Sequence, residues 1–273
     1  MKVRISCIQI EPALYKKEKN ISRMCELIDE TMNTYPSTQL IAFPELTTTG
    51  YECGEKFQDL AEIVGNENAF SIKTMSGYAK KYHVFIVFGF AQRLAYNDDR
   101  IYNSSVLIGN DGTVLGTYQK VHLFDEEKKW FNPGKEFRVF PTEIGRIGLF
   151  ICYDAFFPEA ARVMAIKGVD LLVNSTNWEK PYSYDMDMVM TSRALENTVY
   201  LACCNRIGFD TKLGFFGHSR ILDPLGKVIT CLDEEKEGII SAEIDYLTAE
   251  KMKREYYTML SERRPELYGM LIQ

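Results

Sequence analysis

The sequence is poor in positive charge and in long apolar runs, and each shortage excludes a class of protein. It has 32 lysine and arginine residues against 38 acidic residues, so its net charge at pH 7 is −6. Nucleic-acid binding needs a basic surface, so no nucleic-acid partner is expected. No run reaches the roughly 20 apolar residues that span a membrane, and no membrane partner is expected. The N-terminal residues follow a strand pattern, so no signal peptide is expected.

The cysteines are irregularly spaced, and histidines are few. The seven cysteines are an odd number without framework spacing, so disulfides are not expected and a reducing cytoplasm is the expected compartment. Only three histidines occur. A zinc site built on Cys203 and Cys204 is disfavoured, because adjacent strand residues point to opposite faces. His122 lies two residues from Lys120 and is interpreted as a structural residue. A role in supporting a functional site is left open.

The apolar pattern predicts one large α/β domain. The composition, with 46% hydrophobic and 26% charged residues, is that of an ordinary globular protein. Strands are predicted at 2–10, 39–46, 84–90, 101–108, 113–120, 146–151, 169–173, 199–205, 219–222, 228–232 and 238–244. Helices are predicted at 20–32, 65–81, 159–167, 184–197 and 248–262. Many strands and about five helices indicate a large sheet system covered by helices on its outer faces.

Cys152 lies at the centre of the most informative stretch. The apolar strand 146–151 precedes it, a helix is predicted at 159–167, and a second buried strand follows at 169–173, which together make a βαβ unit. Cys152 therefore lies at the carboxyl end of a strand, where open α/β sheets present side chains to ligands. The positive end of the following helix would favour its thiolate. Alternatively, Cys152 is one more buried cysteine that acts as a small hydrophobic residue.

Two other ionisable residues end apolar strands. Glu45 closes LIAFPE and Lys120 closes YQK. A carboxylate in that position is costly unless it is paired or functional, and it can serve as a general base. A lysine beside a cysteine favours the thiolate and can stabilise an oxyanion. Taken singly, each could be a solvated loop residue; three such groups at strand ends indicate an active site.

The motifs, taken in order, resemble the nitrilase superfamily of carbon–nitrogen hydrolases over nearly the whole chain. The matching strings are FPEL with TGY at 49–51, YQKVHLF, ICYDAFFPEAAR, YNSSVLIGNDG at 102–112, FNPG at 131–134, SRALEN at 192–197 and RRPELY at 263–268. The resemblance implies an α/β fold, a four-layer αββα sandwich. It also implies a single domain over 1–273, with the C-terminal helix and tail at 247–273 used in oligomer contacts.

The resemblance also implies roles for single residues. Glu45, Lys120 and Cys152 would form a catalytic triad, and Glu127, four residues before the Phe of FNPG, would position the substrate or Lys120. Cys152 would attack an amide carbonyl while Glu45 moves the thiol proton. Lys120 and the backbone N–H of Tyr153 would bind the oxyanion, and water would hydrolyse a thioester acyl-enzyme. No metal or organic cofactor is expected.

The wall of the substrate pocket is expected to include Tyr51, Tyr153, Asn177 and Trp178. An amide and several aromatic rings suit a small polar or flat substrate.

Charged residues near this wall bear on the substrate's charge. No arginine occurs between Arg162 and Arg193, whereas N-carbamoyl-D-amino-acid hydrolases of this family hold the substrate carboxylate with an arginine near this stretch. That substrate class is therefore disfavoured. Asp185 and Asp187 could instead favour an amine-bearing substrate, although acids are common at a helix start.

Three functions fit the sequence. The leading hypothesis is an amidase that cleaves a small carboxamide or carbamoyl compound and releases ammonia or an amine. A nitrilase would use the same triad through a thioimidate, and no motif separates the two. A third hypothesis, from a different class, is a catalytically silent scaffold or binding subunit that retains the fold.

A homodimer at least is predicted from the charged C-terminal helix and tail, since the resemblance implies that such segments join subunits. Light scattering at micromolar concentration should give the mass of a dimer or of a larger homo-oligomer. A monomeric mass would contradict this prediction.

Overall fold

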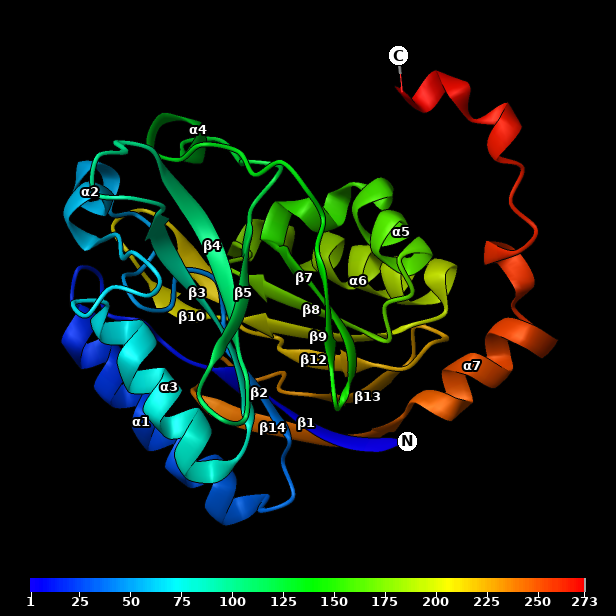
Figure 1. Cartoon of the computed structure of the whole chain (residues 1–273), viewed down its shortest axis with the longest axis horizontal. Coiled ribbons are helices and arrows are strands. Elements are labelled where there is room, and N and C mark those ends of the chain that lie inside the picture. Colours follow the sequence, from blue (N-terminus) through cyan, green and yellow to red (C-terminus); the bar gives the residue numbers. More distant parts are fainter. Residues whose placement is uncertain (273) are drawn as a thin grey trace.

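Two six-stranded sheets form the centre of the molecule (Figure 1), in a computed structural model that describes residues 1–272. In order across the first sheet, the strands are β14 (Gly238–Asp245), β1 (Lys2–Gln9), β2 (Leu40–Ala42), β3 (Phe85–Arg93), β4 (Ile101–Ile108) and β5 (Val114–Gln119). In the second sheet they are β13 (Val228–Cys231), β12 (Arg220–Leu222), β9 (Tyr200–Asn205), β8 (Leu171–Thr176), β7 (Gly145–Ile151) and β6 (Val139–Thr142).

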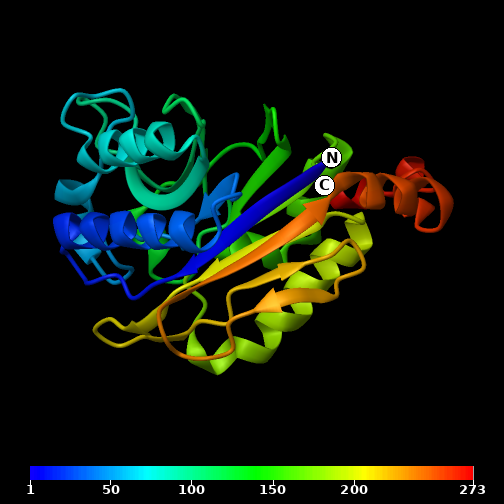
Figure 2. The same ribbon diagram turned by 90° about the horizontal axis from the view of Figure 1, so that it is seen from below.

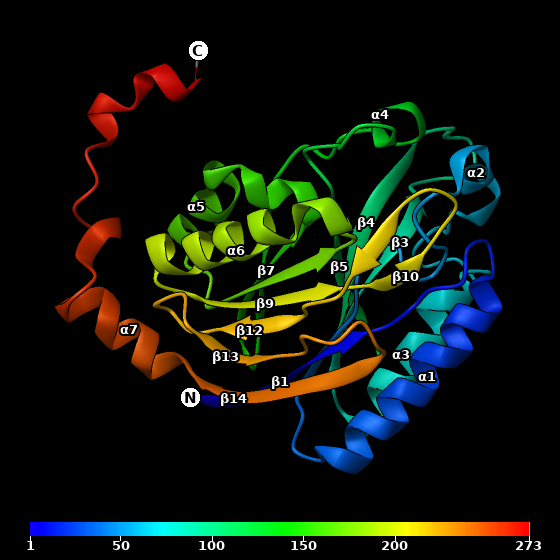
Figure 3. The same ribbon diagram turned by 180° about the vertical axis from the view of Figure 1, so that it is seen from behind.

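Helices cover the outer face of each sheet, which completes four layers (Figures 1 and 3). The helices α1 (Lys17–Thr34) and α3 (Phe70–Tyr82) lie on the first sheet, and α5 (Pro158–Ile166) and α6 (Ser183–Asn197) lie on the second. Two short helices, α2 (Phe57–Leu60) and α4 (Glu127–Trp130), lie in connecting loops. The expected αββα sandwich is thus confirmed.

The alternating side chains of each inner strand fill two different cores. In β3, Phe85 and Val87 point into the core between the sheets, whereas Ile86 and Phe88 pack under α1 and α3. Because both faces of the strand are buried, its sequence is continuously apolar. The predicted βαβ unit is also confirmed. The strands β7 and β8 pair in parallel, and α5 connects them in the sequence.

The structure differs from the predicted elements mainly at their ends. β2 stops at Ala42 rather than at 46, because the chain turns there and Leu46 has a left-handed φ of 44°. The predicted helix at 248–262 ends earlier, since α7 covers Tyr246–Glu255. The hairpin of β10 (Ile207–Phe209) and β11 (Gly214–Phe216) was not predicted, because three-residue strands leave no clear period.

The C-terminal segment leaves the sandwich after α7 and runs beside it (Figures 1 and 2). Its exposed side chains include Tyr256, Leu267, Met270 and Leu271. Of the tail expected at 247–273, Gln273 lies outside the described residues. Within residues 1–272, no helix is both long and apolar enough to cross a membrane.

Two glycines allow the close backbone contacts that place the strand-end residues. A Cβ on Gly89 of β3 would lie 2.3 Å from the backbone nitrogen of Leu46 and 2.6 Å from Cα of Glu45. A Cβ on Gly134 would lie 2.1 Å from the carbonyl oxygen of Gln119, the residue before Lys120. The backbone at Gly89 therefore packs against the backbone of Glu45, and the backbone at Gly134 packs against the residue before Lys120.

The variant Gly89→Ala should lower the free energy of unfolding by about 1–3 kcal/mol, because backbone atoms must move to admit the methyl group. Gly77→Ala on α3 is the matched control. No atom lies within 4 Å of a Cβ built at Gly77, and alanine stabilises a helix interior by up to about 1 kcal/mol over glycine. Urea unfolding measures both, and equal stability of the two variants would contradict the packing argument.

Candidate active site

Glu45 is fully buried in the turn after β2, and its carboxylate is held from three directions. Its Oε1 accepts hydrogen bonds from Asn103 Nδ2 at 2.6 Å and from Lys120 Nζ at 2.8 Å. Its Oε2 accepts from the backbone N–H of Asn177 at 2.9 Å. These partners come from β4, from the end of β5 and from the loop after β8, so Glu45 connects the two sheets. The carboxylate is fixed in orientation as well as in position.

Lys120 is also fully buried and bridges two carboxylates. Its Nζ lies 2.8 Å from Glu45 Oε1 and 2.7 Å from Glu127 Oε1. Glu127, at the start of α4, also accepts a hydrogen bond from the hydroxyl of Tyr51 at 2.9 Å. Its second oxygen accepts from the backbone N–H of Phe124 at 3.1 Å. Both carboxylates thus hold the lysine ammonium in one place.

The three buried charges of this cluster do not cancel. Two carboxylates surround one ammonium, so one negative charge remains in a site that excludes water. Burial and the negative charge of Glu45 raise the pKa of Glu127 to about 7, although Lys120 works in the opposite direction. The cluster therefore takes up a proton near neutral pH.

Cys152 follows β7 in a strained turn. It opens a short 3₁₀ turn, Cys152–Phe156, with a left-handed φ of 44°, which costs a non-glycine residue free energy of the order of 1–3 kcal/mol. The buried carboxylate of Asp154 holds this turn. It accepts hydrogen bonds from the backbone N–H of Ile151 at 3.1 Å, from Tyr118 Oη at 2.7 Å and from the backbone N–H of His122 at 2.9 Å.

His122 takes part in this support rather than in contacts with Cys152. Its ring Nδ1 lies 2.9 Å from Asp154, and the ring stacks on Phe157 with centroids 3.6 Å apart. These contacts favour a structural role for His122, as the sequence analysis expected.

The protonation state expected for Cys152 was wrong. The sequence predicted a thiolate favoured by a following helix, but burial and the negative charge of Glu45 raise the pKa of the Cys152 thiol, despite the opposing effect of Lys120. The helix α5 begins only at Pro158, so its positive end lies beyond the short turn and does not start at Cys152. These effects favour the thiol over the thiolate, so a base that removes the proton would assist attack on a substrate.

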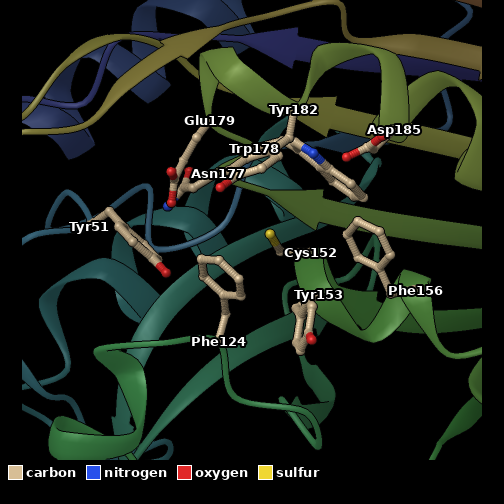
Figure 4. Close-up of a pocket in the computed structure, with 10 residues that line it drawn as sticks. All are labelled: Tyr51, Phe124, Cys152, Tyr153, Phe156, Asn177, Trp178, Glu179, Tyr182 and Asp185. Atoms are coloured by element: carbon tan, nitrogen blue, oxygen red, sulfur yellow. The ribbon is translucent and has the colours of Figure 1, made fainter.

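A cavity of about 200 Å³ opens above Cys152 (Figure 4). Its lining consists of Cys152, six aromatic residues, an amide and two acids: Tyr51, Phe124, Tyr153, Phe156, Trp178, Tyr182, Asn177, Glu179 and Asp185. The cavity is smaller than the 300–1,000 Å³ typical of drug-sized ligands, so it suits a small molecule. It adjoins a wider hollow of about 510 Å³ that shares Tyr51, Phe124, Glu179 and Tyr182 with it.

The structure brings the residues selected from the sequence to one place. The four expected pocket residues, Tyr51, Tyr153, Asn177 and Trp178, all line the cavity that contains Cys152. Sequence reasoning missed Asn103, whose buried amide contacts Glu45. An asparagine inside an apolar strand was the available signal. It also missed Glu179, because an acid beside a predicted loop gives no signal of its own.

No cluster of three or more histidine, cysteine or acidic side chains suitable for a metal ion occurs in the part of the chain that the structure describes. The polar groups around Cys152 are instead a lysine, two carboxylates and amides, which can move protons and stabilise an oxyanion.

The chain is similar to several known proteins in sequence and in fold. The model of the carbon–nitrogen hydrolase family matches residues 4–254. A protein of Schizosaccharomyces pombe named as a probable nitrilase is 48% identical, with 100% of this chain and 99% of that protein covered. The 2-oxoglutaramate amidase of Bacillus subtilis is 31% identical, covering 98% and 100%. The crystal structure of a carbon–nitrogen hydrolase from Helicobacter pylori superimposes with a TM-score of 0.92 at 27% identity, covering 100% and 98%.

The raised pKa of Glu127 predicts a pH dependence of stability. Between its ordinary value of 4.5 and about 7, the folded protein binds a proton that the unfolded chain releases. Stability that is present at low pH is therefore lost as the pH rises toward and through 7. Relative to Glu127→Gln, the wild type should lose about 1–3 kcal/mol between pH 4.5 and 8.

Denaturant unfolding at several pH values measures this difference. Glu126→Gln is the matched control, because Glu126 is an exposed neighbour paired with Lys129. The control should keep the pH dependence of the wild type. An unchanged dependence in Glu127→Gln would mean that another group binds the proton.

Proposed function

The chain belongs to the carbon–nitrogen hydrolase family of the nitrilase superfamily, and from this we propose that it is an amidase that cleaves the C–N bond of small carboxamides or carbamoyl compounds. The products are the acid and ammonia or an amine. Glu45, Lys120 and Cys152 act as the catalytic triad, and Glu127 holds Lys120 in place. The homologous amidase from Bacillus subtilis supports amide substrates.

The observation that carries the proposal is the Lys120 ammonium, which is fixed between two carboxylates beside the only nucleophilic sulfur of the cavity lining described above. A buried charge is costly unless it is fully paired. Here the pairs come from Glu45 and Glu127. Such an arrangement is suited to proton transfer and to oxyanion stabilisation next to Cys152.

The first half of the reaction forms a thioester. Glu45 accepts the thiol proton as the Cys152 sulfur bonds to the amide carbonyl carbon, whose π electrons move to oxygen. Lys120 Nζ and the backbone N–H of Tyr153 bind the resulting oxyanion. When the carbonyl re-forms, the C–N bond breaks and Glu45 gives its proton to the departing nitrogen.

The second half releases the acid. A water molecule loses a proton to Glu45 and adds to the thioester carbonyl, which produces a second oxyanion at the same donors. Collapse of this intermediate breaks the carbon–sulfur bond, and Glu45 returns the proton to the Cys152 sulfur. The enzyme is then restored with a neutral thiol, the state that the raised pKa of Cys152 favours.

A nitrilase is the second candidate, because the probable nitrilase of Schizosaccharomyces pombe is 48% identical to this chain. The same cysteine would add to a nitrile carbon and form a thioimidate, which two water molecules would convert to acid and ammonia.

We also propose that the protein is a homodimer whose subunits meet through the C-terminal tail. The exposed Leu267 and Leu271 support this role, because apolar side chains on a projecting segment are suited to an interface.

Ammonia release from small amides, carbamoyl compounds and nitriles tests the proposed reaction. Wild-type protein should release ammonia from at least one amide or carbamoyl compound. Cys152→Ala should lower kcat by a factor of roughly 10⁴ or more, since loss of a nucleophile removes the covalent route. Its thermal transition should stay within a few degrees of the wild type. Cys25→Ala, on the distant helix α1, is the matched control and should keep full activity.

Each other outcome has a clear meaning. Ammonia released from nitriles alone would identify a nitrilase. Activity retained by Cys152→Ala would remove Cys152 as the nucleophile. No release from any compound would contradict the amidase proposal and favour a scaffold that retains the fold.

A further inference from the structure

The charged side chains that line the cavity above Cys152 are all acidic. Glu179 and Asp185 are the two charged members of the lining, and no lysine or arginine belongs to it among the described residues. Six aromatic rings make up most of the remaining wall. Aromatic faces and carboxylates both attract cations, and both are unfavourable surroundings for an anion.

Glu179 is a half-buried carboxylate without a compensating charge. It follows Asn177 by two residues in an extended segment after β8, so both side chains project from the same face. Figure 4 shows both at the end of the cavity near Tyr51. Burial, followed by the charges of Asp125 and Glu52, raises the pKa of Glu179, and no hydrogen-bond donor or cation among the described residues offsets this. A cationic ligand group would supply the missing charge.

Asn177 gives a second and independent indication of a ligand. Its side chain is only 3% exposed, yet neither Nδ2 nor Oδ1 has a hydrogen-bond partner among the described residues. A buried amide left without partners is energetically costly, so a bound molecule is expected to complete it. Its backbone N–H binds Glu45, which places Asn177 directly beside the catalytic cluster.

Two neighbouring cations are engaged elsewhere. Lys180 forms an ion pair with Glu235 at 2.6 Å, and Arg220 forms one with Asp187 at 2.7 Å. The second pair also corrects the sequence analysis, because Asp187 faces Arg220 and does not line the cavity. Lys212 shares the wider outer hollow with Glu179, but it is not among the charges that shift the pKa of Glu179.

We propose that the substrate carries a protonated amine in addition to its scissile amide, and that the Glu179 carboxylate binds this ammonium. The Asn177 Oδ1 accepts a second hydrogen bond from the same ammonium, and Asn177 Nδ2 donates to an oxygen of the substrate. This inference rests on the proposed amidase function, because it assigns the substrate class of the same site. Glu179 acts as a specificity-determining residue and takes no part in bond breaking.

The test compares three primary amides of similar length: 4-aminobutanamide, which is cationic, pentanamide, which is neutral, and succinamate, which is anionic. The ammonium and the terminal methyl group have nearly the same size, so the first two differ mainly in charge. The wild type should show a kcat/KM for 4-aminobutanamide at least tenfold higher than for pentanamide, and lowest for succinamate. The preference should appear mainly in KM, because the ammonium lies away from the reacting carbonyl.

Glu179→Gln separates a direct contact from a general effect of negative charge. It should reduce the ratio of kcat/KM between 4-aminobutanamide and pentanamide to less than threefold, chiefly by raising KM for the cationic amide. Glu126→Gln removes the same charge from an exposed residue paired with Lys129 and should keep the wild-type ratio. Equal loss of the ratio in both variants would overturn the assignment of Glu179.

The outcomes distinguish this inference from the amidase proposal. Amide hydrolysis without a preference for 4-aminobutanamide would overturn the inference and leave the amidase function intact. If no amide is hydrolysed, calorimetric titration of the wild type and Glu179→Gln with the same compounds still decides the question. Tighter binding of 4-aminobutanamide that is lost in Glu179→Gln would support the cation site, and equal binding of all three would overturn it.

Discussion

The ion pairs of the buried Lys120 ammonium are the interaction on which the rest of the structure depends. A charge without solvent must be fully paired, and its two carboxylates arrive from different parts of the chain. Glu45 comes from the turn after β2 and Glu127 from the loop after β5, while the backbone of Asn177 reaches Glu45 from the opposite sheet. The two sheets must therefore meet at this edge with little freedom. Within the first sheet, glycine at position 89 of β3 lets the turn that carries Glu45 pass closely.

The surroundings of Cys152 follow the same constraint. The left-handed turn costs free energy, and the Asp154 carboxylate offsets that cost by collecting hydrogen bonds from β5, β7 and the segment between β5 and α4. The turn that carries the sulfur is thus held by a buried carboxylate that is not part of the cavity lining. The loop after β8 contributes the side chains of Asn177 and Glu179 to the cavity, and its backbone also holds Glu45 through the N–H of Asn177. The proposed substrate contacts and part of the support of Glu45 therefore come from one segment.

Much of this site could be predicted from the sequence because its residues interrupt apolar strands. Glu45, Lys120 and Cys152 are polar or reactive groups at the ends of buried runs, and the order of their motifs identified the fold. The protonation state of Cys152 could not be predicted, because it depends on the nearby charge of Glu45 and on the distance to α5. Asn103 and Glu179 were missed, since their importance lies in contacts between segments distant in the chain. The β10–β11 hairpin was not predicted, because its three-residue strands are too short to show an alternating apolar pattern.

The neutral thiol of Cys152 has a consequence for the life of the protein in a cell. Peroxide and disulfides react with thiolates, so a sulfur whose proton is retained by burial and by a neighbouring carboxylate is a slow target for both. In the proposed mechanism, nucleophilic character arises only during turnover, when an electrophilic carbon is already in contact with the sulfur and a base accepts the proton. Burial and the charge of Glu45 thus favour the form of the sulfur that oxidants attack slowly.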